Sequence, residues 1–273
     1  MKYTKELQKY EEYLLAKELA KRTREIYLTQ AEKFLEYLKD RTITKEENIA
    51  YKKLLLEQGK KPSTVNLELT AVNSYLKYAG YADCTVKIQK LQRRPLQDNM
   101  MTAEDYKKLL AWAKESGREK YYCIMRTLAL TGIRISELSD CTVEAAEKGK
   151  FLVYNKGKCR EVYLPEKLVA DLKAYCRQNA ITEGVIFRGS RGKPISRNAV
   201  YNMLVKLADE LGIPQGRVHP HSFRHLFAVT YMQQYSNLFD LADILGHSSL
   251  EITRIYTAVT GEERRKKLNK LDL

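Results

Sequence analysis

Apolar residues spaced three and four positions apart constrain this chain most strongly, because that spacing places them on one face of a helix. In the first part of the chain, Ile26, Phe34, Leu35 and Leu38 follow this spacing. Residues 62–76 repeat this spacing, and they begin with Pro-Ser-Thr, which is typical of a helix start. We therefore expect the first part of the chain to form a compact bundle of about four helices.

The periodic spacing stops at residues 83–100, which contain Arg93, Arg94 and Pro95 in succession. We expect a basic linker here, extended at Pro95 because proline disfavours a helical conformation of the residue before it. The chain has 273 residues, a length that favours two domains over one. The expected parts are a helical domain (1–82), the linker (83–100) and a second domain (101–273).

The second part of the chain returns to helical spacing, with one interruption. Phe151 and Val153 alternate with other residues, and so do Val162 and Leu164. Such alternation is typical of strands with one buried face, and the Lys-Gly-Lys sequence between the two runs suits a turn. We therefore expect a mainly α fold with a small β-hairpin, in which an N-terminal helical domain precedes a mixed α/β domain.

Lys and Arg outnumber Asp and Glu by 48 to 34, which gives a formal net charge of +14. A surface this basic attracts nucleic acid, and an anionic membrane surface is the alternative partner. The basic excess occurs in both parts of the chain, which favours two domains that hold a duplex between them. No apolar run has the length of a membrane span and no signal peptide is recognisable, so we expect a cytoplasmic protein without a membrane partner.

The 5 cysteines have no spacing typical of zinc ligands, and their odd number argues against a complete set of disulfides. We expect them to be small, partly buried apolar residues. The sequence also lacks a phosphate-binding GxxxxGK[ST] loop and a cluster of carboxylates that would hold magnesium. No metal and no cofactor is therefore expected.

Five short segments of the second part carry residue types suited to phosphodiester chemistry. Taken singly, each has an ordinary structural explanation, and the tyrosine concerned is one of 19. Together they supply guanidinium groups for the phosphate oxygens, imidazole and lysine for proton transfer, and a tyrosine to attack phosphorus. The segments are TGIRISEL (131–138), NKGKCREVYLP (155–165), HSFRHLF (221–227), LGHSS (245–249) and ITRIYTAV (252–259).

These segments resemble, in order, the active-site boxes of the tyrosine recombinase (phage integrase) family. The resemblance covers residues 102–260, and the helical domain before them resembles the SAM-like core-binding domain of that family. It implies a site-specific recombinase that cleaves and rejoins double-stranded DNA through a 3′-phosphotyrosyl intermediate. Two alternatives stay open from the residues: a type IB topoisomerase, and a non-catalytic DNA-binding regulator.

The resemblance implies a role for each matching residue. Arg134 and Arg224 would bind the scissile phosphate and offset the charge of the transition state. Tyr256, nine residues after His247, would attack the phosphorus. His221 would accept or relay the tyrosine proton.

The leaving 5′-oxygen needs a proton donor, which the resemblance identifies as Lys156. Lys158 lies in the same predicted turn and competes for this role. His247 would donate a hydrogen bond to the phosphate. Glu137, one helical turn after Arg134, would orient the arginine or histidine side chains.

DNA contacts are expected at helix starts of the first domain and in the basic turn and linker, because positive side chains and free backbone amides favour phosphate. The family resemblance further implies a homo-tetramer on two DNA sites, with the C-terminal segment RRKKLNKLDL exchanged between subunits. The target sequence and the outcome, whether integration, excision, inversion or dimer resolution, stay open. The DNA-contact candidates are Lys21, Arg22, Arg24, Lys61, Ser63, Thr64, Asn66, Arg93, Arg94 and Lys158.

Overall fold

The computed structural model describes residues 4–39, 41–91, 100–155, 157–247, 249–253, 255 and 269. The chain divides into two compact units, Met1–Gln92 and Arg93–Leu273. Each unit has an apolar core of its own, so each is described by itself.

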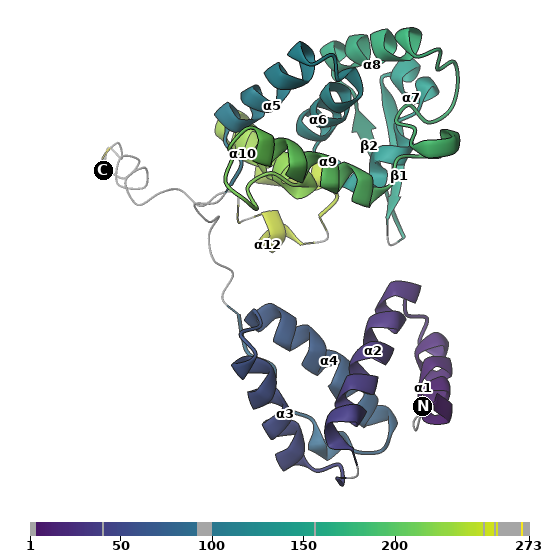
Figure 1. The fold of residues 1–273 in the computed structure, drawn as a ribbon, viewed down its shortest axis with the longest axis vertical. Coiled ribbons are helices and arrows are strands. Elements are labelled where there is room, and N and C mark those ends of the chain that lie inside the picture. The colour runs from purple at the N-terminus through teal and green to yellow at the C-terminus, as the bar shows by residue number, and fades with distance from the viewer. Residues whose placement is uncertain are drawn as a thin grey trace. The chain divides into compact units, whose positions relative to one another are not determined.

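The first unit is a helical bundle, drawn in purple and blue in Figure 1. The helix α4 is its central element, because α1, α2 and α3 all pack against it. The elements are α1 (Thr4–Ala16), α2 (Lys21–Leu38), α3 (Lys45–Glu57), α4 (Pro62–Tyr78) and a short 3-10 helix, η1 (Ala82–Cys84).

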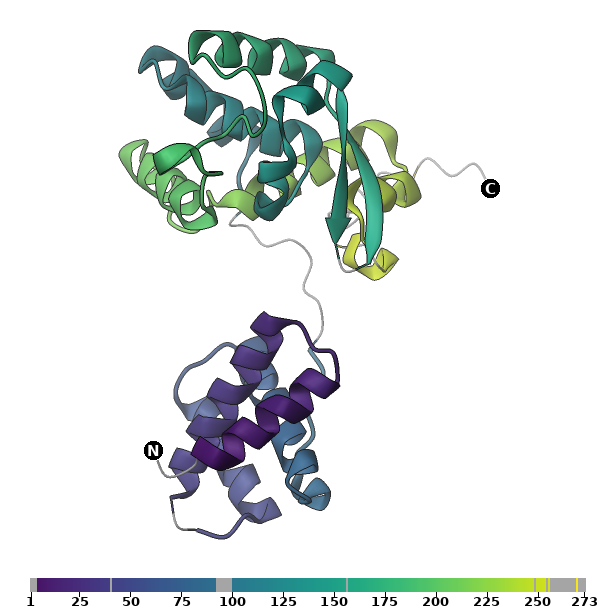
Figure 2. The ribbon, with the colours of Figure 1, turned by 90° about the vertical axis from the view of Figure 1, so that its right-hand side faces the viewer.

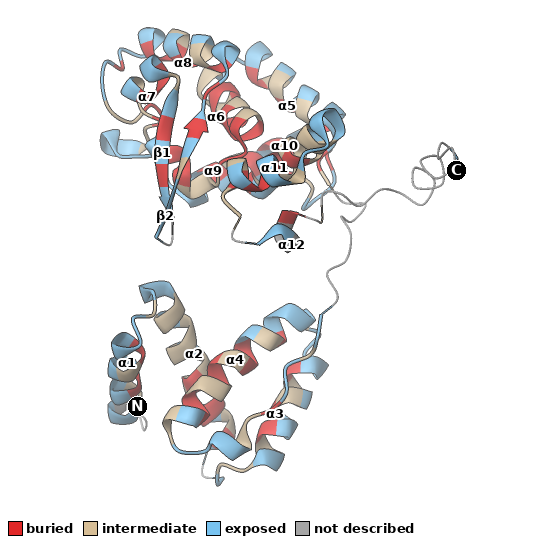
Figure 3. Ribbon diagram, turned by 180° about the vertical axis from the view of Figure 1, so that it is seen from behind, coloured by how far each residue is buried: buried red, intermediate tan, exposed pale blue. Residues whose placement is uncertain are grey.

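One buried stripe of α4 consists of Val65, Leu69, Val72 and Leu76, none of which is exposed to solvent. Their spacing places them on one side of the helix, as predicted from the sequence. Figure 3 shows the buried residues of this unit on the faces that its helices turn toward one another. Burial of this stripe contributes apolar stabilisation to the core of the first unit.

Two asparagine side chains hold the segment after η1 against α4. The Asn73 amide accepts a hydrogen bond from the Val86 N–H (3.0 Å) and donates one to its carbonyl (2.9 Å). Asn66, two turns earlier, pairs in the same way with Gln89, at 3.1 and 2.8 Å. The segment expected to be a linker, 83–100, therefore begins with residues that pack on the first unit.

The second unit packs its helices around α6, where Ile124, Met125 and Leu128 are fully buried. Helices α5, α8 and α10 all contact α6. The elements are α5 (Ala103–Glu115), α6 (Glu119–Thr131), the 3-10 helix η2 (Ile135–Asp140), α7 (Val143–Lys148), β1 (Lys150–Asn155), β2 (Lys158–Tyr163), α8 (Glu166–Gln178), the 3-10 turn η3 (Ser190–Gly192), α9 (Arg197–Glu210), α10 (Pro220–Tyr235), α11 (Leu238–Leu245) and α12 (Leu250–Thr253).

Strands β1 and β2 form the predicted antiparallel hairpin, with Phe151 opposite Val162 and Val153 opposite Arg160. Phe151, Val153 and Val162 are buried, whereas Tyr154 on the other face is exposed. Strand β2 packs beside α11, and Figure 2 shows the C-terminal helices next to the hairpin. The hairpin thus packs on the core through one face, and its chain turns at Gly157.

The observed architecture confirms the predicted fold class, a mainly α chain with one small antiparallel hairpin. The helical N-terminal domain and the mixed second domain are both present. Among the described helices, none combines the length and the apolar character needed to cross a membrane.

Asn73→Ala is expected to lower the free energy of unfolding by about 1–3 kcal/mol, because it leaves the N–H and the carbonyl of buried Val86 without these partners. Urea unfolding of the full chain measures the change. Asn202→Ala, at an exposed position of α9, is the control and should stay within about 0.5 kcal/mol of the unsubstituted chain. Equal stability of Asn73→Ala and the unsubstituted chain would contradict the role of this side chain.

Candidate active site

The candidate site begins where α6 ends. Gly132 terminates that helix with a left-handed backbone (φ 61°), and Arg134 directly precedes η2. A Cβ atom at Gly132 would lie 2.6 Å from Cδ1 of Phe227, so a side chain here meets both strain and a clash. Glycine at this position therefore allows the chain to turn tightly and present Arg134 beside the core.

Glu137 is a buried carboxylate that two arginines bind. It accepts hydrogen bonds from the Arg134 backbone (2.8 Å) and from the Arg134 Nη1 (3.0 Å). It also accepts bonds from the Arg160 Nη2 (2.7 Å) and Nη1 (3.2 Å). Burial alone would raise the pKa of Glu137, but the hydrogen bonds from Arg160 and Arg134 outweigh it and the pKa is lowered. The carboxylate is therefore ionised at neutral pH.

The C-terminal end of α11 is the second anchor of the site. Its last carbonyl oxygens lack partners within the helix and carry partial negative charge, which favours cations there. Three guanidinium groups bind three successive carbonyls at this end. The pairs are Arg160 Nε to Ile244 (3.0 Å), Arg224 Nη2 to Leu245 (2.6 Å) and Arg134 Nη2 to Gly246 (3.4 Å).

Arg224 also ties α10 to the end of α6. Its Nη1 donates to the carbonyl of Gly132 (2.6 Å), and the residue is 4% exposed. The two predicted phosphate-binding arginines thus share their anchors, since Arg134 lies two residues after Gly132 and both side chains bind the end of α11. Two guanidinium groups fixed side by side offer the planar donor geometry that a phosphate accepts.

All 4 histidines of the chain gather around these arginines. Burial, assisted by the charges of Arg224 and Arg134, lowers the pKa of His247 to about 4. Burial also lowers the pKa of His225 to about 4. The pKa of His221 is lowered as well, by burial and then by Arg224. Neutral imidazoles at physiological pH are able to accept a proton, which is the task predicted for His221.

His247 is held at the end of α11 by its neighbours in the chain. Its backbone N–H donates to Ala242, and its Nδ1 lies 2.7 Å from the hydroxyl oxygen of buried Thr253 in α12. A hydrogen bond at Nδ1 orients the ring and leaves Nε2 for another partner. The structure thus gives the predicted phosphate-contacting histidine a fixed orientation.

The structure brings together five of the seven predicted active-site residues. These are Arg134, Glu137, His221, Arg224 and His247. Lys156 and Tyr256 lie outside the described residues. Lys158, the competitor of Lys156, is exposed at the start of β2. The roles of all seven residues stay predictions at this point.

Three further residues of the site were missing from the sequence-based set: Arg160, His219 and His225. Arg160 had a recognisable signal, because it lies two residues before the inward-facing Val162 of β2 and therefore on the same face of the strand. A charged side chain at an inward position requires a buried partner of opposite charge, which is Glu137. His225 follows His221 by one helical turn and so lies on the same side of α10.

The predicted DNA contacts of the first unit fall at the starts of α2 and α4. Lys21, Lys61, Ser63 and Thr64 are exposed there. The Arg22 side chain is exposed and forms an ion pair with Glu25 at 3.3 Å, and Arg24 is partly buried. The amide of Asn66 binds Gln89, as described above. Arg93 and Arg94 lie outside the described residues.

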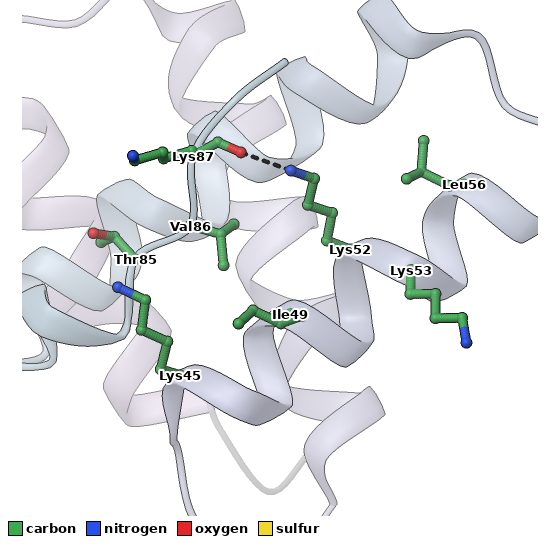
Figure 4. Close-up of a pocket in the computed structure, with 8 residues that line it drawn as sticks. All are labelled: Lys45, Ile49, Lys52, Lys53, Leu56, Thr85, Val86 and Lys87. Carbon is green, nitrogen blue, oxygen red and sulfur yellow. Dashed lines mark hydrogen bonds between the residues drawn. The ribbon is translucent and has the colours of Figure 1, made fainter.

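The first unit has a concave surface of about 430 Å³ between α3 and residues 85–87 (Figure 4). Ile49, Leu56 and Val86 supply apolar lining, and lysines surround them. Lys52 donates to the carbonyl of Lys87 (2.8 Å). The lining contains no imidazole, guanidinium or tyrosine group. This surface therefore lacks the residue types proposed to cleave phosphodiesters. The remaining lining residues are Lys45, Lys53 and Thr85.

Comparison with known proteins gives matches to both units. Residues 99–263 match the model of the phage integrase family, and residues 7–81 match that of the phage integrase N-terminal SAM-like domain. Tyrosine recombinase XerA of Pyrococcus furiosus is 27% identical over 275 residues, covering 98% of this chain and 94% of that protein.

Solved structures share the fold. XerH site-specific recombinase bound to its difH substrate superposes with a TM-score of 0.73 at 18% identity, covering 92% of this chain and 79% of that one. A lambda integrase dimer bound to a COC' core site gives a TM-score of 0.74 at 20% identity, with 94% and 77% covered. These likenesses concern the fold, and they extend over both units.

Gly132→Ala is expected to destabilise the second unit more than Gly149→Ala. Both glycines end helices with positive φ, 61° and 69°, so each substitution carries the strain of a left-handed alanine, about 1–2 kcal/mol. A Cβ at Gly149 meets nothing within 4 Å, whereas at Gly132 it meets Phe227 at 2.6 Å. Urea unfolding compares the two variants, and equal losses would show that the close contact costs nothing.

Stability is expected to fall as the pH drops from 6.5 to about 4, because partly buried His247 and His225 resist protonation. The pKa of His247 is lowered from 6.5 to about 4, so over this window the unfolded state binds more protons than the folded state. Urea unfolding at a series of pH values measures the slope. His247→Gln should make the dependence shallower, and an unchanged slope in that variant would argue against a buried neutral imidazole.

Proposed function

This chain belongs to the phage integrase family, and on that premise we propose how its residues carry out the reaction of a tyrosine-type site-specific DNA recombinase. The enzyme cleaves double-stranded DNA and rejoins it through a covalent link to tyrosine. The observation that carries the assignment of residues is the pair of arginines fixed at the end of α11, next to neutral histidines.

Arg134 and Arg224 bind the scissile phosphate in this scheme. Their positive charge offsets the charge that builds up on the non-bridging oxygens as phosphorus becomes pentacoordinate. Both side chains are anchored within the protein before DNA arrives, Arg134 on Glu137 and Arg224 on Gly132. Anchored donors need no reorganisation during the reaction, which is what makes them effective.

Tyr256 is the nucleophile in this scheme. Its oxygen forms a bond to phosphorus while the bond from phosphorus to the 5′-oxygen breaks, which leaves a 3′-phosphotyrosine and a free 5′-hydroxyl. His221 accepts the tyrosine proton, and its lowered pKa keeps it neutral for that task. Support for Tyr256 comes from its place in the segment ITRIYTAV (252–259), within the part of the chain that matches the family model.

Lys156 supplies the proton that the departing 5′-oxygen takes up. It lies between β1 and β2 in the sequence, and Lys158 at the start of β2 is the alternative donor. His247 donates a hydrogen bond to the phosphate from the nitrogen that does not face Thr253. The phosphotyrosyl bond retains the energy of the cleaved bond, so a 5′-hydroxyl from another strand reverses the step without ATP.

Double-stranded DNA is the substrate, and both units of this basic chain bind it. In this proposal, exposed Lys21, Lys61, Ser63 and Thr64 at two helix starts contact DNA phosphates, because positive side chains and free backbone amides favour phosphate. Four copies of the chain assemble on two paired sites and exchange their C-terminal segments RRKKLNKLDL. The leucines of that segment, which lie outside the described residues, would pack on the neighbouring subunit. We also propose that the enzyme acts in the cytoplasm.

Covalent capture tests the nucleophile. The protein is incubated with randomised duplexes nicked near the centre, so that cleavage releases a short strand and traps the covalent complex. The unsubstituted chain should form an adduct that resists denaturant, and sequencing the adduct identifies the target site. Tyr256→Phe should abolish the adduct and keep DNA binding, because the fold is unchanged and the attacking oxygen is lost.

Tyr235→Phe is the matched control, since Tyr235 is an exposed tyrosine of the same unit. It should form the adduct at the unsubstituted rate. An adduct that persists in Tyr256→Phe would show that another residue is the nucleophile. Chelation of divalent metal ions should leave adduct formation unchanged.

A further inference from the structure

Arg160 is a largely buried arginine to which the proposed reaction gives no role. Its side chain is 12% exposed. Nη1 and Nη2 donate to Glu137, and Nε donates to the carbonyl of Ile244. All three nitrogens of the Arg160 guanidinium group therefore donate to acceptors within the protein, and two of these bonds go to Glu137.

Glu137 is the shared partner of Arg160 and Arg134. One carboxylate and two guanidinium groups leave one net positive charge in this cluster. Exposure decides where that charge is available: the side chain of Arg134 is 26% exposed, that of Arg160 12% and that of Glu137 4%. The net charge therefore faces solvent through Arg134. If Arg160 were absent, the carboxylate would cancel the charge of Arg134, and strongly so at this degree of burial.

The path of the chain favours the same arrangement. Arg160 lies opposite Val153 in the hairpin and reaches across to the end of α11. A Cβ atom at Gly246 would lie 2.9 Å from Cδ of Arg160, so glycine allows the chain after α11 to pass directly against the arginine stem. The guanidinium group is held in place from two sides, by Glu137 and by Ile244.

We propose that Arg160 is a positioning residue for strand cleavage: it binds and neutralises Glu137, so that Arg134 keeps both its positive charge and its orientation toward the scissile phosphate. The inference rests on the proposed function, because it requires Arg134 to bind that phosphate. Arg160 acts through Glu137 and Arg134 and does not touch the substrate. Sequence spacing around the active-site segments gives Arg160 no such role.

Three variants separate the charge of Arg160 from its packing. Arg160→Met keeps the length of the side chain and removes the charge, whereas Arg160→Lys keeps the charge and loses the fork of donors. Arg160→Met combined with Glu137→Gln removes the carboxylate that Arg160 neutralises. The readout is the single-turnover rate of covalent adduct formation on a duplex recovered by the capture experiment, with the unfolding temperature of each variant measured alongside.

Arg160→Met should slow adduct formation by about 100-fold, at the lower end of what the loss of one preorganised donor costs. Arg160→Lys should retain much more of the rate. The double variant should recover most of it, because no carboxylate is left to cancel the charge of Arg134. If Arg160 had only a structural role, the double variant would be at least as slow as Arg160→Met, because the second substitution weakens the hydrogen bonding further.

Arg126→Met is the matched control for loss of a partly buried ion pair. Arg126 binds Asp171 at 2.8 Å in the same unit, and its side chain is 19% exposed. This variant should lower the unfolding temperature and leave the rate of the folded protein unchanged. A double variant as slow as Arg160→Met would overturn the inference, and so would an unchanged rate in Arg160→Met.

Failure of the inference is distinguishable from failure of the proposed function. If the unsubstituted chain forms no adduct, or Tyr256→Phe still forms one, the proposed nucleophile is wrong and the inference falls with it. If the adduct depends on Tyr256 and the double variant is not rescued, the inference alone is wrong.

Discussion

Arginine side chains bound to the end of α11 are the arrangement on which the second unit depends. Arg134 precedes η2, Arg160 belongs to β2 and Arg224 to α10, and each binds a different carbonyl at that helix end. The carbonyls need donors because the helix supplies none, and their partial negative charge favours cations. One helix end therefore fixes three segments of the chain relative to one another and gathers their positive charges.

Burial around this arrangement sets the protonation states of the site. Glu137 is ionised because two arginines outweigh the cost of burying it, and the lowered pKa of His247 and His225 keeps both neutral. Neutral histidines beside arginines avoid repulsion between like charges and remain able to accept protons. The same burial makes the fold sensitive to acid, so the chemistry of the site and its pH stability have one cause.

Sequence spacing predicts the elements whose stabilising contacts are local. The stripe along α4 and the alternation around Phe151 and Val162 follow from helix and strand geometry alone. The pairing of Arg134 with Gly246 joins residues 112 positions apart, and no local pattern specifies it. The resemblance to a family nevertheless located Arg134, because its chemistry is carried by short segments. It gave no role to Arg160, which acts on neighbouring protein groups.

Polar residues at helix starts show a second limit of prediction from sequence. Asn66 was a candidate DNA contact because of its place near the start of α4, and the structure uses its amide to bind Gln89. An amide that can hydrogen-bond to a phosphate can also hydrogen-bond to a backbone peptide group. Which of the two partners it binds depends on the path of a later segment of the chain. The roles of Tyr256 as nucleophile and of Lys156 as proton donor are predicted from the segments ITRIYTAV (252–259) and NKGKCREVYLP (155–165). Both residues lie outside the described part of the chain.

The anchoring of Arg134 and Arg224 to backbone carbonyls has a thermodynamic consequence for the encounter with DNA. A free arginine side chain carries about 2 kcal/mol of rotamer entropy, which must be given up when it is immobilised on a ligand. Here folding has already removed much of that freedom. Binding of the phosphate can then proceed with little further ordering of these two side chains, and more of the interaction energy remains for stabilising the transition state.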